Sequence, residues 1–478
     1  MAAQDRPPTP VVERRTIDVV PDSERHGTPF NQFTLWFGAN MQITAVVDGA
    51  LAVVFGADPL WAVVGLLVGN LLGGVFMALH SAQGPRLGLP QMISSRAQFG
   101  VYGAVVPIVL VIVMYLGFAA TGTVLAGQAV NQIAHTDARP VGIIVFGLLT
   151  AVVAVLGYRY IHALGRVATV LGIVGFTYLM IRVVSDHDLG GLFGAKAFDG
   201  PTFLLAISLG AGWQLTFGPY VADYSRYLPR TTSPRTTFHC TLWGSVIGSQ
   251  WAMSFGVLLA ALPAQKGGGF LANQVGFMGH LGGGAVALLI YLVIIVGKLT
   301  INTLNAYGGF MSILTTVSAF TSERRVTQLA RTLYITGFLV LSMLVALLAS
   351  EDFLSNFKNF VLMLLMVFTP WSAINLVDYY LVSKERIDIP ALYDPKGRYG
   401  RWNAVALGCY VVGVAAQIPF LSQTLYTGPV TKMLDGADIS WIIGLALTAA
   451  LYYPLAKRHS RAPAELIPAE SPDPAPTA

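Results

Sequence analysis

Long apolar stretches, separated by short polar or Gly/Pro-rich segments, run along nearly the whole chain. An α-helix needs about 20 predominantly apolar residues to cross the hydrocarbon core of a bilayer, and most of these stretches have that length. Charged residues and Gly/Pro punctuation mark their ends. We therefore predict an all-α polytopic membrane protein with twelve transmembrane helices, at residues 33–55, 59–81, 104–131, 140–157, 161–184, 201–222, 239–262, 284–317, 330–349, 356–382, 403–422 and 438–456.

Composition and charge support this prediction and indicate an orientation. Of the 478 residues, 54% are hydrophobic and only 11% are charged, whereas soluble domains carry roughly 25% charged residues. If both termini are cytoplasmic, the inner segments of the predicted map hold 22 lysines and arginines and the outer loops hold 4. Basic residues accumulate on the cytoplasmic side of membrane proteins. Topology thus explains the net charge of +5, and we expect no nucleic-acid partner.

The two ends of the chain are polar. The first thirty residues lack the short apolar core and the cleavage site of a secretory signal, so we expect residues 1–30 to form a cytoplasmic tail. The Pro/Ala-rich residues 457–478 are predicted to be a disordered cytoplasmic tail. Cys240 and Cys409 fit neither a disulfide framework nor a metal-ligand spacing.

The first and sixth predicted helices contain residues that a continuous lipid-facing helix would avoid. The first contains Gly38 and Asn40, and the sixth contains Gly210, Gly212, Gly218 and Pro219. Glycine inside a helix costs about 1 kcal/mol and proline about 3 kcal/mol. Non-helical backbone at membrane depth is tolerated where protein or a water-filled cavity surrounds it. We predict that both helices are broken, although the glycines could instead permit close packing between helices.

These two interruptions suggest an internal symmetry. They lie at equivalent positions if residues 31–185 and 200–382 are repeats of five helices each, followed by two more helices within 403–456. An odd number of helices per repeat would place the two repeats in opposite orientations. Paired interruptions in inverted repeats point to the central binding site of a secondary transporter.

The eighth predicted helix carries a polar stripe. Lys298, Asn302 and Asn305 are spaced four and three residues apart, so they share one helix face. A charged group at the bilayer centre costs at least ~2.5 kcal/mol, so the stripe should face the protein interior. The Lys298 ammonium could occupy the place of a bound cation, or gain and lose a proton. Alternatively, it could form a fixed ion pair, or reach from the end of a span to the membrane surface. The two carboxamides could bind the donor/acceptor edge of a planar heterocycle, or join neighbouring helices.

Asp48 and His80 are two further ionisable residues, among others, within the predicted helices. Asp48, late in the first helix, could be a proton-relay carboxylate, but we interpret it as a cap near the outer end of that span. His80 lies at the end of the second predicted helix, and we expect it at the membrane interface.

Four sequence stretches resemble the nucleobase:cation symporter family, in its purine–cytosine permease branch. They are "NQFTLWFGAN" (31–40), "GPRLGLPQMISSRAQFG" (84–100), "WQLTFGPYVADYSRYLP" (213–229) and "NTLNAYGGF" (302–310). The similarity extends, in order, over nearly the whole predicted membrane region. It implies a LeuT-type fold of ten core helices plus two, and cation-coupled uptake of a nucleobase or a related ring.

The resemblance also implies how a ring would be held. Members of this family grip the heterocycle between aromatic side chains of helices 3 and 6. The corresponding residues here are Phe118, where relatives more often have tryptophan, and either Trp213 or Phe217, of which we favour Trp213. Gln214 could bond the ring or point away from it.

The family's helix 8 asparagine and cation site can be carried over in the same way. Asn305, with Asn302 beside it, would bond the edge of the ring. Sodium-coupled relatives bind the ion between helix 1 carbonyls and helix 8 hydroxyls, which implies Ala39, Gln42 and Thr300 as candidates, with a possible Na⁺ at Ala39 and Thr300. Lys298 departs from the family pattern and favours protons over sodium.

We therefore predict a symporter that imports a cytosine- or purine-like heterocycle with H⁺ or Na⁺, and that needs no other cofactor. We expect it to be a monomer in the inner or plasma membrane. One alternative is a transporter of the same fold that carries an amino acid or another small solute. A second is an intramembrane lipid-modifying enzyme, but the sequence lacks the clustered His/Asp or Ser/His set that it would need. No Walker loop for an ATP-driven pump is present.

Overall fold

A computed structural model describes residues 17–156, 158–193, 196–263, 269–321, 327–349 and 351–468. In this part of the chain every regular element is helical, and only two isolated β-bridges occur. The elements are η1 (Asp22–Glu24), α1 (Phe30–Asn40), α2 (Ile43–Val54), α3 (Pro59–Leu87), α4 (Gln91–Ser94), α5 (Arg96–Phe99), α6 (Val105–Ile133), α7 (Arg139–Leu156), α8 (Tyr158–Asp186), α9 (Gly200–Leu215), α10 (Val221–Ser225), α11 (Pro234–Ala261), α12 (Gln274–Gly282), α13 (Gly284–Phe320), α14 (Gln328–Ala349), α15 (Phe353–Leu376), η2 (Val377–Val382), η3 (Pro390–Tyr393), α16 (Ala404–Ala415), η4 (Ile418–Phe420), α17 (Pro429–Met433) and α18 (Ser440–Arg458).

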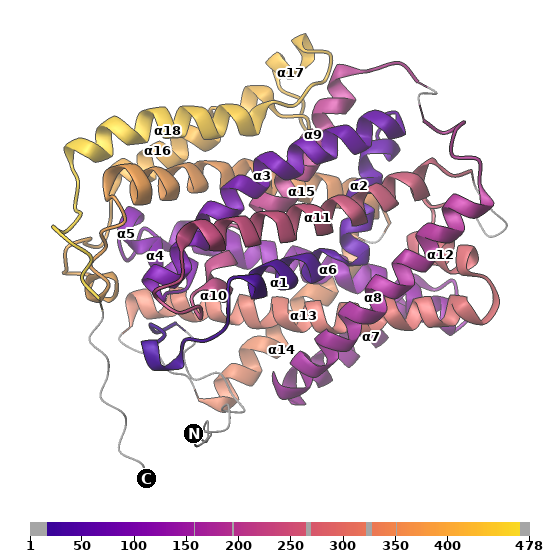
Figure 1. Cartoon of the computed structure of the whole chain (residues 1–478), viewed down its shortest axis with the longest axis horizontal. Helices are drawn as coiled ribbons and strands as arrows, with labels where there is room; N and C mark the ends of the chain where they lie inside the picture. The colour runs from indigo at the N-terminus through magenta and orange to yellow at the C-terminus, as the bar shows by residue number, and fades with distance from the viewer. Residues whose placement is uncertain are drawn as a thin grey trace, which may run out of the picture.

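The long helices lie side by side along the long axis of the molecule (Figure 1). Six of the described helices are long and apolar enough to cross a membrane: α3, α6, α11, α13, α14, and α15 continued by η2. The bent pair α1 and α2 could form a seventh, and two shorter apolar helices span Arg139–Ala154 and Ala404–Phe420. The protein is therefore a multi-pass membrane protein.

Local sequence explains where α3 begins and ends. The Asp58 side chain accepts a hydrogen bond from Leu60 N (2.9 Å) and caps the first turn. Gly88, with φ 66°, ends the helix in the left-handed conformation that glycine adopts most easily. The helix thus continues six residues beyond the predicted end at 81. The sequence did not predict the short helices α4 and α5 that follow.

The chain is interrupted between α1 and α2, which are bent by 61° relative to each other. The interruption lies at Met41 and Gln42, just after the predicted Gly38 and Asn40, and Gln42 is extended (φ −142°, ψ 156°). The Asn40 side chain donates to its own helix at Trp36 O (2.7 Å). Such local bonds compete with the helical backbone pattern. The last turn of α1 therefore does not continue into α2.

A second interruption separates α9 from α10. Residues 216–220, which contain Gly218 and Pro219, are not helical. Gly210 has a different role, because it lies where α9 packs on α3. A Cβ at Gly210 would lie 2.7 Å from Leu66 O, and Gly69 of α3 faces the backbone of α9 in return. For Gly210, close helix packing is therefore the correct interpretation.

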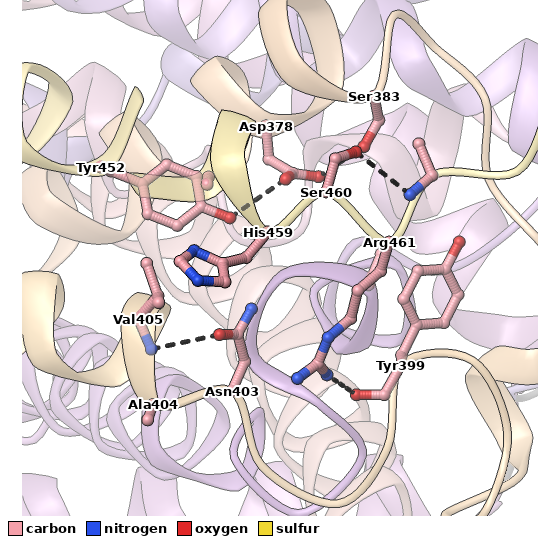
Figure 2. Close-up of a pocket in the computed structure, with 13 residues that line it drawn as sticks. Asp378, Ser383, Tyr399, Asn403, Ala404, Val405, Tyr452, His459, Ser460 and Arg461 are labelled. Atoms are coloured by element: carbon pink, nitrogen blue, oxygen red, sulfur yellow. Dashed lines mark hydrogen bonds between the residues drawn. The ribbon is translucent and has the colours of Figure 1, made fainter. Parts of the chain in front are cut away.

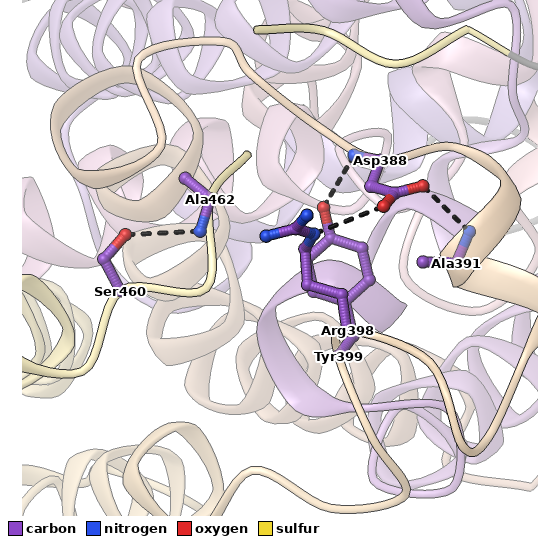
Figure 3. Close-up of polar contacts among 6 residues, drawn as sticks. All are labelled: Asp388, Ala391, Arg398, Tyr399, Ser460 and Ala462. Atoms are coloured by element: carbon purple, nitrogen blue, oxygen red, sulfur yellow. Dashed lines mark hydrogen bonds and ion pairs between the residues drawn. The ribbon is translucent and has the colours of Figure 1, made fainter. Parts of the chain in front are cut away.

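The segment 459–468, which we name the C-terminal strap, lies against the 383–403 loop. Ile467 pairs with this loop through Ile467 N to Ile387 O and Ile389 N to Ile467 O, both 3.0 Å. In the loop, Arg398 and Asp388 form a 3.2 Å ion pair, and Asp388 N donates to the Tyr399 hydroxyl at 2.8 Å (Figure 3).

These contacts correct the prediction of a tail that is disordered from 457. Lys457 and Arg458 end α18, and the strap is fixed by backbone hydrogen bonds. Residues 469–478 lie outside the described residues. At the other end, residues 1–16 also lie outside them, but Ile17 and Val20 are fully buried and Val20 N donates to Gly88 O (2.9 Å). The tail predicted at 1–30 is therefore packed against the bundle from residue 17 onward.

Candidate functional site

The polar stripe of α13 lies inside the protein, as its polarity predicts. Lys298, Asn302 and Asn305 are 2%, 1% and 8% exposed. Their helix packs along α6 and α14, and the leucines on its other face, such as Leu289 at 60%, are exposed. Lipid can therefore cover the apolar face while protein covers the stripe.

Lys298 reaches the interruption between α1 and α2. Its ammonium donates to Gln42 Oε1 (2.8 Å) and to Thr44 Oγ1. In the described part of the chain no carboxylate forms an ion pair with it. The fixed ion pair considered from the sequence is therefore absent from the described residues, and the amine does not reach towards the membrane surface.

The proposed sodium ligands have other partners. Ala39 O accepts a hydrogen bond from Gln42 Nε2 (2.9 Å), and Thr300 Oγ1 donates to Val296 O on its own helix (3.1 Å). The Gln42 side-chain oxygen accepts from the Lys298 ammonium. At this interruption the ammonium of Lys298 therefore occupies an oxygen that a sodium ion would otherwise use, whereas Thr300 Oγ1 keeps its lone pairs.

The two asparagines of the stripe differ in their contacts. Asn302 joins α13 to α6, because its Nδ2 donates to Ala119 O (2.9 Å) and Thr123 Oγ1 (3.0 Å). Its Oδ1 lies against Gly122 of α6 and has no hydrogen-bond partner among the described residues, and neither has the buried Nδ2 of Asn305. Buried amide atoms are nearly always hydrogen-bonded. The stripe therefore offers one free acceptor and one free donor, three residues apart on a helix.

Aromatic side chains from α6 and α9 come together. The ring centroids of Phe118 and Trp213 are 5.9 Å apart, and those of Trp213 and Phe217 are 5.8 Å apart, both in edge-to-face arrangements. The Trp213 indole donates to Asn40 Oδ1 at 2.6 Å. The structure thus brings all three predicted aromatics together and fixes the Trp213 ring on the last residue of α1.

Gln214 is the predicted site residue that the structure separates from this group. Its Nε2 donates to Asn70 Oδ1 (3.0 Å) and Ser249 Oγ (2.9 Å), and its Oε1 accepts from Ser245 Oγ (2.6 Å). Its side chain is fully buried between α3 and α11. Of the two possibilities raised from the sequence, pointing away is the one observed.

Sequence reasoning missed two members of the group. Trp36 of α1 lies 5.2 Å from Phe217 between ring centroids, and Phe360 of α15 lies 5.3 Å from Phe118. Asn40 was noted only as a helix-breaking residue. Its spacing of four from Trp36 places both on one face of α1, and that pattern could have marked Asn40 as a partner for a buried indole.

Two other sequence interpretations are wrong. Asp48 does not cap a span end, because it lies in the middle of α2, is fully buried, and has no hydrogen-bond partner at either carboxyl oxygen. His80 is not interfacial but fully buried. Its ring stacks on Trp371 with centroids 4.6 Å apart, and its Nε2 lies 3.2 Å from Ser372 Oγ. In both cases the neighbouring helices supply the burial, and a single-helix pattern does not show them.

A cavity of about 150 Å³ lies elsewhere, between η2, the 383–403 loop, α16, α18 and the C-terminal strap (Figure 2). Asp378 is one wall, and it accepts from Tyr452 Oη (3.0 Å) and Ser383 Oγ (3.0 Å). The Arg461 guanidinium donates to Tyr399 O. Burial raises the pKa of the Tyr399 phenol to about 12, so this phenol is neutral at physiological pH. No sequence pattern pointed to this cavity.

Comparison with known sequences gives consistent matches. The pattern of the family described as permease for cytosine/purines, uracil, thiamine, allantoin matches residues 19–444. YxlA of Bacillus subtilis, which carries a provisional purine-cytosine permease name, is 39% identical over 447 residues, covering 93% of this chain and 96% of YxlA. The purine-cytosine permease fcyB of Emericella nidulans is 26% identical and covers 92% of this chain and 87% of its own length.

Comparison with solved structures identifies the fold. The inward-facing conformation of Mhp1 superposes with a TM-score of 0.74 at 20% identity and covers 95% of both chains. Mhp1, a nucleobase-cation-symport-1 family transporter, in a closed conformation with bromovinylhydantoin bound, gives a TM-score of 0.71 at 20% identity. It covers 95% of this chain and 98% of that structure.

Proposed function

Because the chain belongs to the family of permeases for cytosine/purines, uracil, thiamine and allantoin, we propose that it imports a nucleobase or a related planar heterocycle together with a cation. The protein is a transporter and not an enzyme. The substrate, the ion and the residues that bind them are the parts proposed here. Import into the cell across the inner or plasma membrane, by a monomer with both termini in the cytoplasm, completes the proposal.

The architecture proposed for this activity has twelve spans. Residues 31–185 and 200–382 form two inverted repeats, and 403–456 add two helices. The interrupted pairs α1/α2 and α9/α10 are the first helices of the two repeats. The likeness to Mhp1 over 95% of the chain and the two observed interruptions support this arrangement.

One observation carries the proposed binding site: the free amide acceptor of Asn302 and the free amide donor of Asn305 on the buried stripe. A nucleobase edge presents donors and acceptors side by side, so it can satisfy both atoms. Leaving a buried polar atom unpaired costs about 1–3 kcal/mol, which is recovered when such an edge binds. A substrate without this edge would leave the cost in place, and that difference provides selectivity.

Stacking supplies the rest of the affinity. A base that inserts between Phe118 and Trp213 gains about 1–3 kcal/mol from aromatic contact. Trp213 is the better candidate than Phe217, because its indole is held by Asn40 and needs little reordering.

For the coupling ion, the contacts favour H⁺ over Na⁺. The Lys298 ammonium already lies on Gln42 and Thr44 at the first interruption, and Ala39 O already accepts a hydrogen bond from Gln42. A sodium ion would have to displace this amine.

A thermal-shift panel on the purified protein tests the substrate class. Ligands that bind only the folded state stabilise it, by about 2.7 kcal/mol at 100 times Kd. Purines, cytosine, uracil, hydantoin and allantoin should raise the unfolding temperature selectively, with no requirement for sodium. If amino acids stabilise the protein and no heterocycle does, the proposal fails in favour of the amino-acid alternative.

A further inference from the structure

Asp48 is a buried acid that the binding site described above does not use. It lies in the middle of α2 at 0% exposure, and no donor in the described part of the chain bonds either carboxyl oxygen. Burying an ionised carboxylate without a partner is far more costly than burying a neutral acid. The observed surroundings therefore suit the protonated form of this group.

Lys298 is the complementary case, a buried ammonium whose partners are neutral. One of them, Thr44, lies four residues before Asp48 on α2, so both side chains project from one face, about 6 Å apart along the helix. Lysine carries its charge on a flexible four-carbon stem. The same amine can therefore donate a hydrogen bond to Thr44 or form an ion pair with Asp48, one turn further along the helix.

We propose that Asp48 takes up the proton that is coupled to transport, and that it exchanges this proton for an ion pair with Lys298. The inference rests on the proposed transport function and deepens it. In the unloaded form, the Asp48 carboxylate pairs with the ammonium. A proton from water then adds to a carboxylate oxygen, the ion pair breaks, and the ammonium moves to Gln42 and Thr44, as observed. Lys298 stays charged throughout, so the site gains one positive charge.

This exchange is linked to the shape of the first interruption. Gln42 is the extended residue between α1 and α2, and its side chain bonds both the Lys298 ammonium and Ala39 O. When the amine leaves, Gln42 loses that contact. The protonation of Asp48 thus determines whether the amine bonds Gln42, and hence which contacts hold α1 and α2. Coupling requires that the proton favour one arrangement of these two helices over another.

No other charged group competes for Asp48 on the helices that pack against α2 in the described structure. Helix α9 carries no titratable side chain. Tyr115 of α6 packs on Tyr220, and Lys358 of α15 lies over Phe55, beyond the end of α2. The remaining titratable groups of these helices lie far along α3 and in the first turns of α11, namely His80, Arg86, Arg235, His239 and Cys240.

Proteoliposomes test the proposal by separating binding and exchange from accumulation. Asp48→Asn mimics the protonated acid, so substrate counterflow is expected to remain while accumulation driven by a pH gradient is lost. Asp48→Glu keeps a carboxyl group and should retain accumulation. Asp378→Asn is the matched control, because Asp378 is also buried but accepts three hydrogen bonds, and it should accumulate substrate as the wild type does. Accumulation by Asp48→Asn equal to that of the wild type overturns the proposal.

An infrared measurement tests the same group independently of transport. Wild-type protein with ¹³C-labelled aspartate carboxyls should show the C=O stretch of a protonated acid, which Asp48→Asn lacks and Asp378→Asn keeps. A wild-type spectrum with only carboxylate bands overturns the proposal even if a heterocycle is transported. A protonated Asp48 in a protein that moves no heterocycle would instead refute the proposed function.

Discussion

Replacing Asn40 by alanine tests whether the Trp213 ring is held in place from α1. The Asn40 side chain accepts from the Trp213 indole (2.6 Å) and donates to Trp36 O (2.7 Å) and Ser245 Oγ (3.1 Å). Both Asn40 and Trp213 are at most 1% exposed, so water cannot replace the lost acceptor. The unpaired indole N–H then costs about 1–3 kcal/mol. The ring can avoid this cost only by leaving the position in which it would stack on substrate.

The size of the effect follows from this cost. If about 1.4 kcal/mol of it falls on binding, substrate Kd rises about tenfold in Asn40→Ala. Trp213→Phe removes the N–H, so adding Asn40→Ala to that variant leaves no unpaired donor on the ring and should change Kd by much less. The four proteins form a double-mutant cycle, and contacting residues typically couple by about 0.5–3 kcal/mol.

Equilibrium binding of a radiolabelled substrate to the purified proteins measures the cycle. Gln417→Ala is a suitable control, because Gln417 is also a fully buried amide, but it donates to Met366 O and Gly413 O, away from the aromatic group. It should lower thermal stability with little change in Kd. The reasoning is refuted if Asn40→Ala raises Kd by the same factor with and without the indole.

Three further outcomes are expected. Asn305→Ala should abolish uptake while membrane insertion stays normal, because it removes the free donor of the stripe, and the exposed Asn356→Ala should have no effect; normal uptake in the first variant removes Asn305 from the site. Trp213→Ala should weaken substrate binding more than Trp213→Phe, since phenylalanine still stacks, and equal losses would argue against stacking. Uptake by Lys298→Met in liposomes, measured against pH and sodium, should lose its pH dependence; if uptake requires sodium and this variant behaves like the wild type, the proton hypothesis is wrong.

Properties carried by a single helix could be predicted from the sequence. The spacing of Lys298, Asn302 and Asn305 was enough to infer a buried face, because lipid cannot satisfy three polar groups. Properties that depend on a second helix could not be predicted. Gln214 turns away because its partners come from α3 and α11, and Asp48 is buried because other helices cover its side of α2. The sequence contains those residues without showing that they meet.

The seam between Gly69 and Gly210 restricts how such a molecule can change shape. Helices slide past each other when the side chains between them change rotamers, but at Gly69 and Gly210 the main chain of one helix meets the main chain of the other directly. Translation along this seam would have to separate α3 and α9 first. We therefore expect α3 and α9 to move together, so that a movement exposing the binding site would involve the contacts of other helices.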